Sequence, residues 1–339
     1  MTSDKNIRIR SMTDLVVAVP YLLGFAPADG SLVVIAIGDS GFPLVARVDL
    51  PAPGTVGLFN DALVQVVRRQ EGVAAVVVLG YGEREPLEPV LRAVADAFTA
   101  DGLPVRDLIR VTGSRVFSLV CTDQQCCPPE GVPYDPTTSV TAVQATVAGA
   151  VAHPDRDTIA ARFAPVVGEA RQRMRSAIDR AVQRLDTLWA NRGEPAVVQA
   201  GEQAVRTAIA AHDLGRQLTL DQTAWLSVVV TSVKEARDFA LTQTQARLEH
   251  VELWAQVTRQ AQPPFTATPA ALLATTAWRC GDGVLARLAA EHALRLAPDH
   301  QLAALVLDAL QAGIPPSRFE HALATWTQPD TDSTPGGPA

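Results

Sequence analysis

A change in hydrophobic periodicity around residues 122–137 constrains the fold of this chain more than any other sequence feature. Before it, short apolar runs alternate with segments of helical period, as in domains where helices cover a sheet. After it, helical periodicity dominates, and only residues 225–231 can also be interpreted as a strand. The stretch itself, TDQQCCPPEGVPYDPT, contains four prolines and no apolar period, which is typical of a loop. The sequence therefore predicts two parts joined by this loop.

The first part, residues 1–125, is predicted to be an α/β domain with a mixed sheet. A β-branched run at 31–37 and an alternating run at 44–50 predict a hairpin around the turn Gly38-Asp39-Ser40-Gly41. Residues 73–79 are apolar throughout, as expected of a central strand covered on both faces. The remaining predicted elements are helices at 12–23, 55–70 and 85–100 and strands at 104–111 and 115–121. After the first helix, the order β-β-α-β-α-β-β indicates a three-layer domain.

The second part, residues 139–327, is predicted to be an all-α helical half, reached through a linker loop at 126–138. Residues 241–257 repeat the pattern of one long helical face formed by Ala170, Met174, Ala177, Ala181, Leu185 and Leu188. Alanine-rich helices then flank a turn at Gly281-Asp282 and end at Pro298, which is partly tetratricopeptide-like. A repeat array needs at least about three such units, so an ordinary alanine-rich hairpin is the alternative. Residues 328–339 are predicted to be a disordered tail.

Charge limits the classes of partner. The chain has 29 basic and 36 acidic residues, a formal net charge of −7, and the excess is shared by both parts. This balance argues against nucleic-acid binding through bulk charge. On the predicted long helix, arginines flank the apolar face in two rows and indicate a solvated surface. The basic run comprises Arg162, Arg171, Arg173, Arg175, Arg180 and Arg184.

The hydropathy of the sequence indicates where in the cell the protein is expected. No run of ~18 uninterrupted apolar residues is present, so no membrane partner is expected. Basic residues and an apolar run near the N-terminus imitate a signal peptide, but Asp14 and Pro20 interrupt the pattern. We therefore expect a cytoplasmic protein with reduced thiols.

Three of the four cysteines, Cys121, Cys126 and Cys127, are close in sequence and form the pattern C-x4-C-C. No cofactor is needed to explain this pattern, but zinc is the candidate metal ion, because cysteine thiolates bind it from neighbouring loops. A fourth ligand would then be Cys280, His153 or a carboxylate. The alternatives are a Cys121–Cys126 redox bridge and structural thiols, with Cys121 a small core residue at a strand end.

A second candidate site lies where the central strand leads into a helix. Ligands of open α/β sheets bind at the carboxyl ends of strands. Together with Asp29 and Ser31, the loop residues Gly80, Tyr81, Gly82 and Glu83 form a candidate ligand-binding set. The pattern lacks the third glycine of a dinucleotide fingerprint, and its acids would repel phosphate. A cationic or neutral ligand is expected there, and a tight strand-to-helix turn is the alternative.

Recognisable catalytic motifs are absent from the sequence: the six histidines form no H-x-x-x-H pair, and no G-x-S-x-G elbow is present. The sequence therefore favours a non-enzymatic regulatory or scaffolding protein that binds a protein partner through its helical half. An enzyme or small-molecule sensor with its site at the strand ends is the alternative, and a zinc-stabilised module is a third hypothesis.

Several stretches resemble an actinobacterial family of uncharacterised proteins, the domain of unknown function four-one-nine-two. They are residues 20–27 (PYLLGFAP) with Asp29 and 31–34, residues 126–133 (CCPPEGVP), and the C-terminal segments 277–279, 281–283 and 296–298. One departure is visible, because Gly30 separates Asp29 from Ser31 where the family pattern has Asp and Ser adjacent. The resemblance implies a bacterial, cytoplasmic protein and no particular activity.

Overall fold

The structure is a computed structural model that describes residues 9–39, 41–52 and 54–327, with side chains described through 321. Contacts divide the chain into two units, Met1–Ile159 and Ala160–Ala339. The division falls later than the predicted loop at 126–138, because helix α4 (Val140–Val147) packs against α1 (Met12–Leu23) in the first unit. Ser40 of the predicted turn and the predicted tail lie outside the described residues.

The first unit contains a mixed six-stranded sheet in the order β2-β1-β3-β4-β5-β6, which confirms the predicted sheet. β1 runs antiparallel to β2 and β3, β3 and β4 are parallel, and β5 and β6 are antiparallel additions at the edge. The strands are β1 (Ser31–Gly38), β2 (Gly41–Asp49), β3 (Val73–Tyr81), β4 (Val105–Thr112), β5 (Arg115–Ser118) and β6 (Val132–Pro133). β5 ends before Cys121, and β6 was not predicted.

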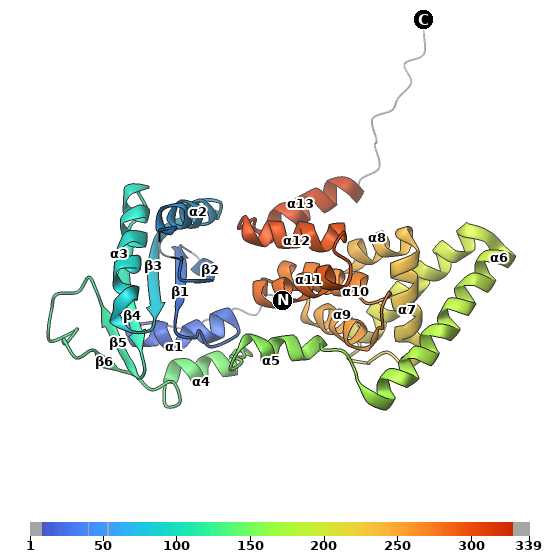
Figure 1. Cartoon of the computed structure of the whole chain (residues 1–339), viewed down its shortest axis with the longest axis horizontal. Coiled ribbons are helices and arrows are strands. Elements are labelled where there is room, and N and C mark those ends of the chain that lie inside the picture. The colour runs from blue at the N-terminus through green and yellow to red at the C-terminus, as the bar shows by residue number, and fades with distance from the viewer. Residues whose placement is uncertain (1–8, 40, 53, 328–339) are drawn as a thin grey trace, which may run out of the picture. The chain divides into compact units, whose positions relative to one another are not determined.

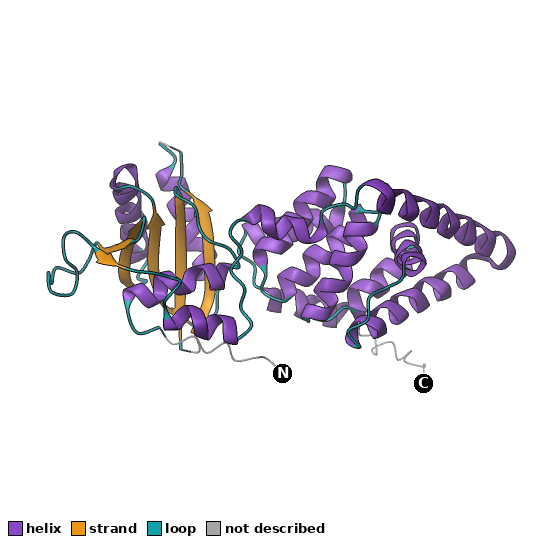
Figure 2. Cartoon of the chain, turned by 90° about the horizontal axis from the view of Figure 1, so that it is seen from below, coloured by secondary structure: helices purple, strands orange, loops and turns teal. Residues whose placement is uncertain are grey.

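Helices cover both faces of this sheet (Figure 2). On one face, α2 (Val56–Arg68) and α3 (Arg84–Ala100) pack over a core that includes Leu32, Val34, Val76 and Val78. The alternate residues Val33, Ile35, Val77 and Leu79 are equally buried, and by strand alternation they face the side of α1 and α4. The predicted helices and the hairpin of the first unit are thereby confirmed, within a few residues at their ends.

The second unit is helical throughout its described part (Figure 1). Residues 225–231, which the sequence left open to a strand, lie in α7, and the single helix predicted at 241–257 is divided between α8 and α9. The elements are η1 (Ala161–Phe163), α6 (Gly168–Asp213), α7 (Leu220–Ser232), α8 (Lys234–Gln243), α9 (Leu248–Gln260), α10 (Ala267–Arg279), α11 (Gly283–Leu296), α12 (Gln301–Gln311) and α13 (Pro316–Thr327). Helix α5 (Arg156–Ala160) spans the division between the units.

Helices α10 and α11 form the predicted pair around Gly281. Ala274, Ala277, Ala286 and Ala290 are fully buried between or beneath them, and Asp282 caps α11 by accepting from the Leu285 amide at 2.9 Å. Small side chains allow close approach of the two helices. The pair is a helical hairpin, and its tetratricopeptide character stays a prediction.

Helix α6 consists of two arms that meet at a bend (Figure 1). Gly193 breaks the helix with φ 71° and ψ −175°, a conformation that side chains with a Cβ disfavour. Pro195 then lies in the first turn of the second arm, where its missing N–H costs no hydrogen bond. Among the described residues, no helix is both long and apolar enough to cross a membrane.

Candidate functional site

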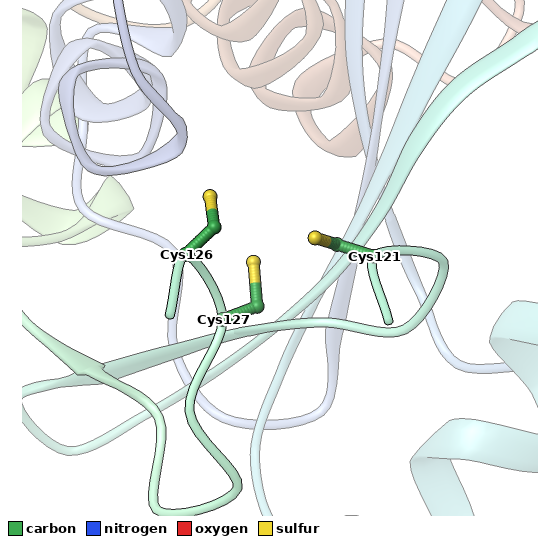
Figure 3. Close-up of side chains that lie close together, drawn as sticks. All are labelled: Cys121, Cys126 and Cys127. Atoms are coloured by element: carbon green, nitrogen blue, oxygen red, sulfur yellow. The ribbon is translucent and has the colours of Figure 1, made fainter. Parts of the chain in front are cut away.

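The three clustered cysteines converge in space (Figure 3). Their sulfur atoms all lie within 4.8 Å of one another, although Cys121 and Cys126 are separated by a turn of four residues. Figure 3 shows Cys121 facing Cys126 and Cys127 across the loop that follows β5. Among the described residues, no other cysteine, histidine or carboxylate joins this group.

Backbone hydrogen bonds hold the loop that carries these thiols. The Asp123 carbonyl accepts from the amides of Cys126 (3.2 Å) and Cys127 (2.7 Å). The amide of Cys121 donates to Ser118 Oγ at 3.1 Å, and that hydroxyl donates to Asp107 Oδ1 at 2.7 Å. The loop is therefore tied to the turn at Asp123 and to the sheet through Asp107.

The return of the loop to the sheet is also fixed. Arg115 Nη1 donates to the carbonyls of Glu130 (3.0 Å) and Gly131 (2.8 Å). Gly131 has φ +80°, and a Cβ there would lie 2.6 Å from the Phe117 ring. Only glycine fits this close passage without displacing the ring, so the sequence CCPPEGVP returns the chain into β6.

The environment of the thiols contradicts one of the predicted roles. Cys121 is exposed and lies beyond the end of β5, so the interpretation of Cys121 as a core residue at a strand end is wrong. Partial burial of Cys127, with hydrogen bonds from its S–H group to the sulfurs of Cys121 and Cys126, raises the pKa of its thiol to about 12. Without a bound cation the Cys127 thiol is therefore protonated at neutral pH.

The sequence suggested Cys280 or His153 as a fourth ligand. Cys280 lies in the second unit as the C-cap residue of α10, and burial raises the pKa of its thiol to about 11. His153 pairs its backbone with Phe25 in an isolated bridge. Neither residue is in the cysteine group of the described structure.

The second predicted set converges at one edge of the sheet. Ser31 and Tyr81 are direct partners in the β1–β3 ladder, and the Gly30 amide donates to the Tyr81 carbonyl at 2.8 Å. A Cβ on Gly82, whose φ is +135°, would lie 4.0 Å from Asp29 Cβ. The structure thus brings Asp29, Ser31 and residues 80–83 together, as the position of the strand ends predicts.

Several polar groups at this edge already have partners within the chain. Ser31 Oγ is fully buried and accepts from Arg47 Nε (2.9 Å) and Nη2 (2.8 Å). Thr112 Oγ1 donates to Glu83 Oε1 at 3.1 Å. There is no room for a side chain at Gly80, because a Cβ there would lie 2.6 Å from Leu87 Cδ1. These contacts explain Gly80 and Glu83 as parts of a tight strand-to-helix turn and Ser31 as a buried partner of Arg47.

Tyr81 differs from its neighbours, because its hydroxyl is buried and has no hydrogen-bond partner among the described residues. Burial, with a smaller effect of Tyr134, raises the pKa of Tyr81 far above its usual value. The phenol is therefore neutral at physiological pH and offers an unused donor.

The second unit contains a groove that the sequence did not predict. It encloses about 490 Å³ between the two arms of α6 and the start of α7. Ala196, Ala200, Ala204 and Ala208 recur every four residues on the second arm and line it. Their small side chains leave the space open, and the opposite wall consists of Arg184, Leu188 and Arg192.

The groove combines positive charge, amide groups and apolar surface. Arg184 stacks its guanidinium on the Trp225 ring, 4.1 Å from the centroid. Gln199, Gln203 and Gln222 add amide side chains, and no lining residue carries a carboxylate. In the described part of the chain, neither Arg184 nor Arg192 forms an ion pair. Two cations therefore face an acid-free groove.

Four other arginines of the basic run have partners within the chain, whereas Arg175 forms no ion pair in the described part of the chain. Arg162 pairs with Glu252, Arg173 with Glu169 at 2.7 Å, and Arg180 with Asp221. Arg171 Nε donates to Gln262 Oε1 at 3.0 Å. These contacts match the predicted solvated helix face, and within this run Arg184 is the arginine that lines the groove.

Comparison with known proteins places the chain in a family. A family model described as Domain of unknown function (DUF4192) matches residues 13–317. The chain belongs to this family. The matched range contains the cysteine loop and the groove of this DUF4192 chain, and it confirms the resemblance carried by PYLLGFAP and CCPPEGVP. No curated protein and no solved structure matches the chain.

Proposed function

We propose that this chain is a non-enzymatic regulatory or scaffolding protein of the cytoplasm, whose helical unit binds an acidic segment of a partner protein in the α6 groove. The observation that carries the proposal is the acid-free groove with two unpaired arginines. Arginine guanidinium groups bind carboxylates in bidentate geometry, which gives both affinity and orientation.

The length of the groove favours a peptide over a compact ligand. Residues 196–208 rise about 18 Å along the helix axis, at about 1.5 Å per residue. An extended peptide advances about 3.3 Å per residue, so roughly five residues span the alanine-lined wall. The glutamine side chains can pair with a peptide backbone, while Leu188 and Trp225 offer contact for an apolar side chain.

The proposal predicts a charge-selective peptide preference. A phage-displayed library of random 12-residue peptides, selected on the full chain, is expected to enrich peptides with Asp or Glu beside an apolar residue. Substitution R184S together with R192S should weaken the selected peptides by roughly 10-fold or more, because charge-assisted pairs contribute about 1.5–3 kcal/mol each.

A matched control is available on the same helix. Arg173 and Arg180 lie on the first arm of α6 but are paired with Glu169 and Asp221. The double variant R173S/R180S should therefore bind the selected peptides like the wild type. Enrichment of peptides without acidic residues, or equal loss in both double variants, would refute the proposed groove.

A second candidate function is a small-molecule site at the strand ends of the first unit. The observation in its favour is the unpartnered hydroxyl of Tyr81 beside the converging Asp29 and Gly82. It predicts that a ligand of cationic or neutral character raises the thermal midpoint (Tm) of the wild type and not of Y81F. A screen of such compounds in which both proteins shift equally would exclude this site.

A further inference from the structure

We propose that Cys121, Cys126 and Cys127 form a zinc site with three thiolate ligands and one coordination position open to an outside ligand. The site is independent of the peptide groove, since it lies in the other unit and uses none of the same residues. The inference rests on the spacing of the sulfurs, their exposure and the soft-donor character of the set.

The sulfur spacing fits a tetrahedral ion. With Zn–S distances of about 2.3 Å, the edges of a tetrahedron are about 3.8 Å long. The three sulfurs already lie within 4.8 Å of one another, so a contraction of about 1 Å or less completes the geometry. The hydrogen-bonded turn at Asp123 and the anchored return at Gly131 bring the thiols together before any ion arrives.

The exposure of the cluster argues against the other roles of cysteine. Unligated cysteine is among the most buried residue types and packs as a small apolar group. All three side chains are instead at least partly exposed on a loop. A Cys121–Cys126 bridge would account for two sulfurs and leave the approach of the third unexplained, whereas a metal ion accounts for all three.

The donor set indicates the ion and its coordination. Three thiolates select soft or borderline cations, and a d¹⁰ ion such as Zn²⁺ has no redox chemistry of its own. Binding releases one proton from each thiol and leaves a site of net charge −1. Because no fourth protein ligand joins the group among the described residues, water or a donor group of another molecule takes the fourth position.

The test uses tag-free, full-length protein carrying C280S, so that only the clustered thiols remain. Metal-free reduced protein is titrated with Co²⁺, whose thiolate charge-transfer band reports sulfur ligation, and then with Zn²⁺. We expect saturation at about one equivalent, displacement of Co²⁺ by Zn²⁺, and protection of all three thiols from a thiol reagent.

Single variants C121S, C126S and C127S in this background identify the ligands. Removing a group that only supports a metal ligand lowers metal affinity roughly 10–100-fold. Each of these variants removes a ligand itself and should therefore lose more Zn²⁺ affinity than that. Circular dichroism checks that each variant keeps the fold, and C280S alone is the matched control. Three results would overturn the site: no charge-transfer band, unchanged Zn²⁺ affinity in any one of the three variants, or a Cys121–Cys126 disulfide in protein isolated without reductant.

Discussion

At the scale of single residues, Asp14 shows how one carboxylate fixes two helices. Its Oδ1 accepts from Thr141 Oγ1 of α4 at 2.9 Å, and its Oδ2 accepts from the Arg10 amide at 3.0 Å. Burial opposes the charge, but these hydrogen bonds outweigh it and hold the pKa of Asp14 below its usual value. The residue that directly precedes the signal-like apolar run therefore joins α1 to α4.

We predict that Asp14→Ala destabilises the first unit by about 1–2 kcal/mol, because the Thr141 hydroxyl and the Arg10 amide lose their acceptor. Urea unfolding measures the change in unfolding free energy. Asp14→Asn keeps one carbonyl acceptor and should cost less. Equal stability of the alanine variant and the wild type would contradict the assigned role.

Two histidines of the second unit make stability depend on pH. Burial, with help from Arg295, lowers the pKa of His292, whose Nε2 is buried without a partner among the described residues and whose ring lies 5.7 Å from that of Phe163. Burial also lowers the pKa of His300, whose Nδ1 accepts from the Ala303 amide at 3.4 Å at the start of α12. Both rings therefore favour the neutral form in the folded chain.

The sign of the pH effect follows from proton binding. Below about pH 6.5 the unfolded chain binds more protons at these histidines than the folded chain, so stability is lost as pH falls. The Tm should drop between about pH 7.5 and 5.5, and it should drop less in H292N/H300N, where neither side chain titrates in this range. An identical pH slope in both proteins would show that other groups cause the loss.

At the scale of elements, the strongest helix packing constraint is at Gly201 in the second arm of α6. A Cβ at this position would lie 2.7 Å from the Cβ of Ala236 in α8. Gly201→Ala should therefore cost about 1–3 kcal/mol of unfolding free energy through overpacking. Adding Ala236→Gly should recover part of the loss, which a double-mutant cycle by urea unfolding would measure.

A glycine in open space provides the control for that substitution. Gly57 lies in the first turn of α2, and a Cβ there meets nothing within 4 Å. Gly57→Ala should leave stability unchanged or raise it by up to about 1 kcal/mol, since alanine has the better helix propensity. If G57A lost as much unfolding free energy as G201A, the effect would come from replacing a glycine and not from the α6–α8 contact.

The elements also show where sequence periodicity predicts structure and where it fails. Helix α1 has the bounds predicted for it, 12–23, because its N-cap Ser11 and its C-cap Gly24 are local signals. Helix α7 was not predicted, because residues 223–230 are buried on every side and the sequence therefore lacks the amphipathic pattern of a surface helix. Strand β6 has only two residues, and its pairing depends on where the proline-rich loop returns.

The candidate sites also differ in whether the sequence predicts them. The three thiols lie together because their spacing in sequence is short, and the strand-end residues lie together because the start of β1 pairs with the end of the antiparallel strand β3. The groove was not predicted, because the alanine repeat faces Arg184 only after the bend at Gly193 turns the second arm of α6. The Gly193-Glu194-Pro195 sequence is the signal that would have indicated this bend.

At the scale of the whole molecule, the division near residue 159 predicts a simple proteolysis pattern. No lysine or arginine occurs between Arg115 and Arg156, so trypsin cannot cut within the cysteine loop. Arg156 and Arg162 lie where the two units meet along the chain. Mild trypsin treatment should therefore first cleave after one of these residues, and mass spectrometry identifies the sites. A first cut within α6 would contradict the division.

The central claim, that the α6 groove binds an acidic segment, is tested most directly by reversing its charge. R184E/R192E should lose the acidic peptides selected on the wild type, and selection on this variant should enrich peptides rich in Lys or Arg instead. Fluorescence anisotropy of one selected peptide from each pool measures both affinities on both proteins. Each peptide should bind more tightly to the protein on which it was selected. Equal affinity of a peptide for both proteins would contradict the proposed groove.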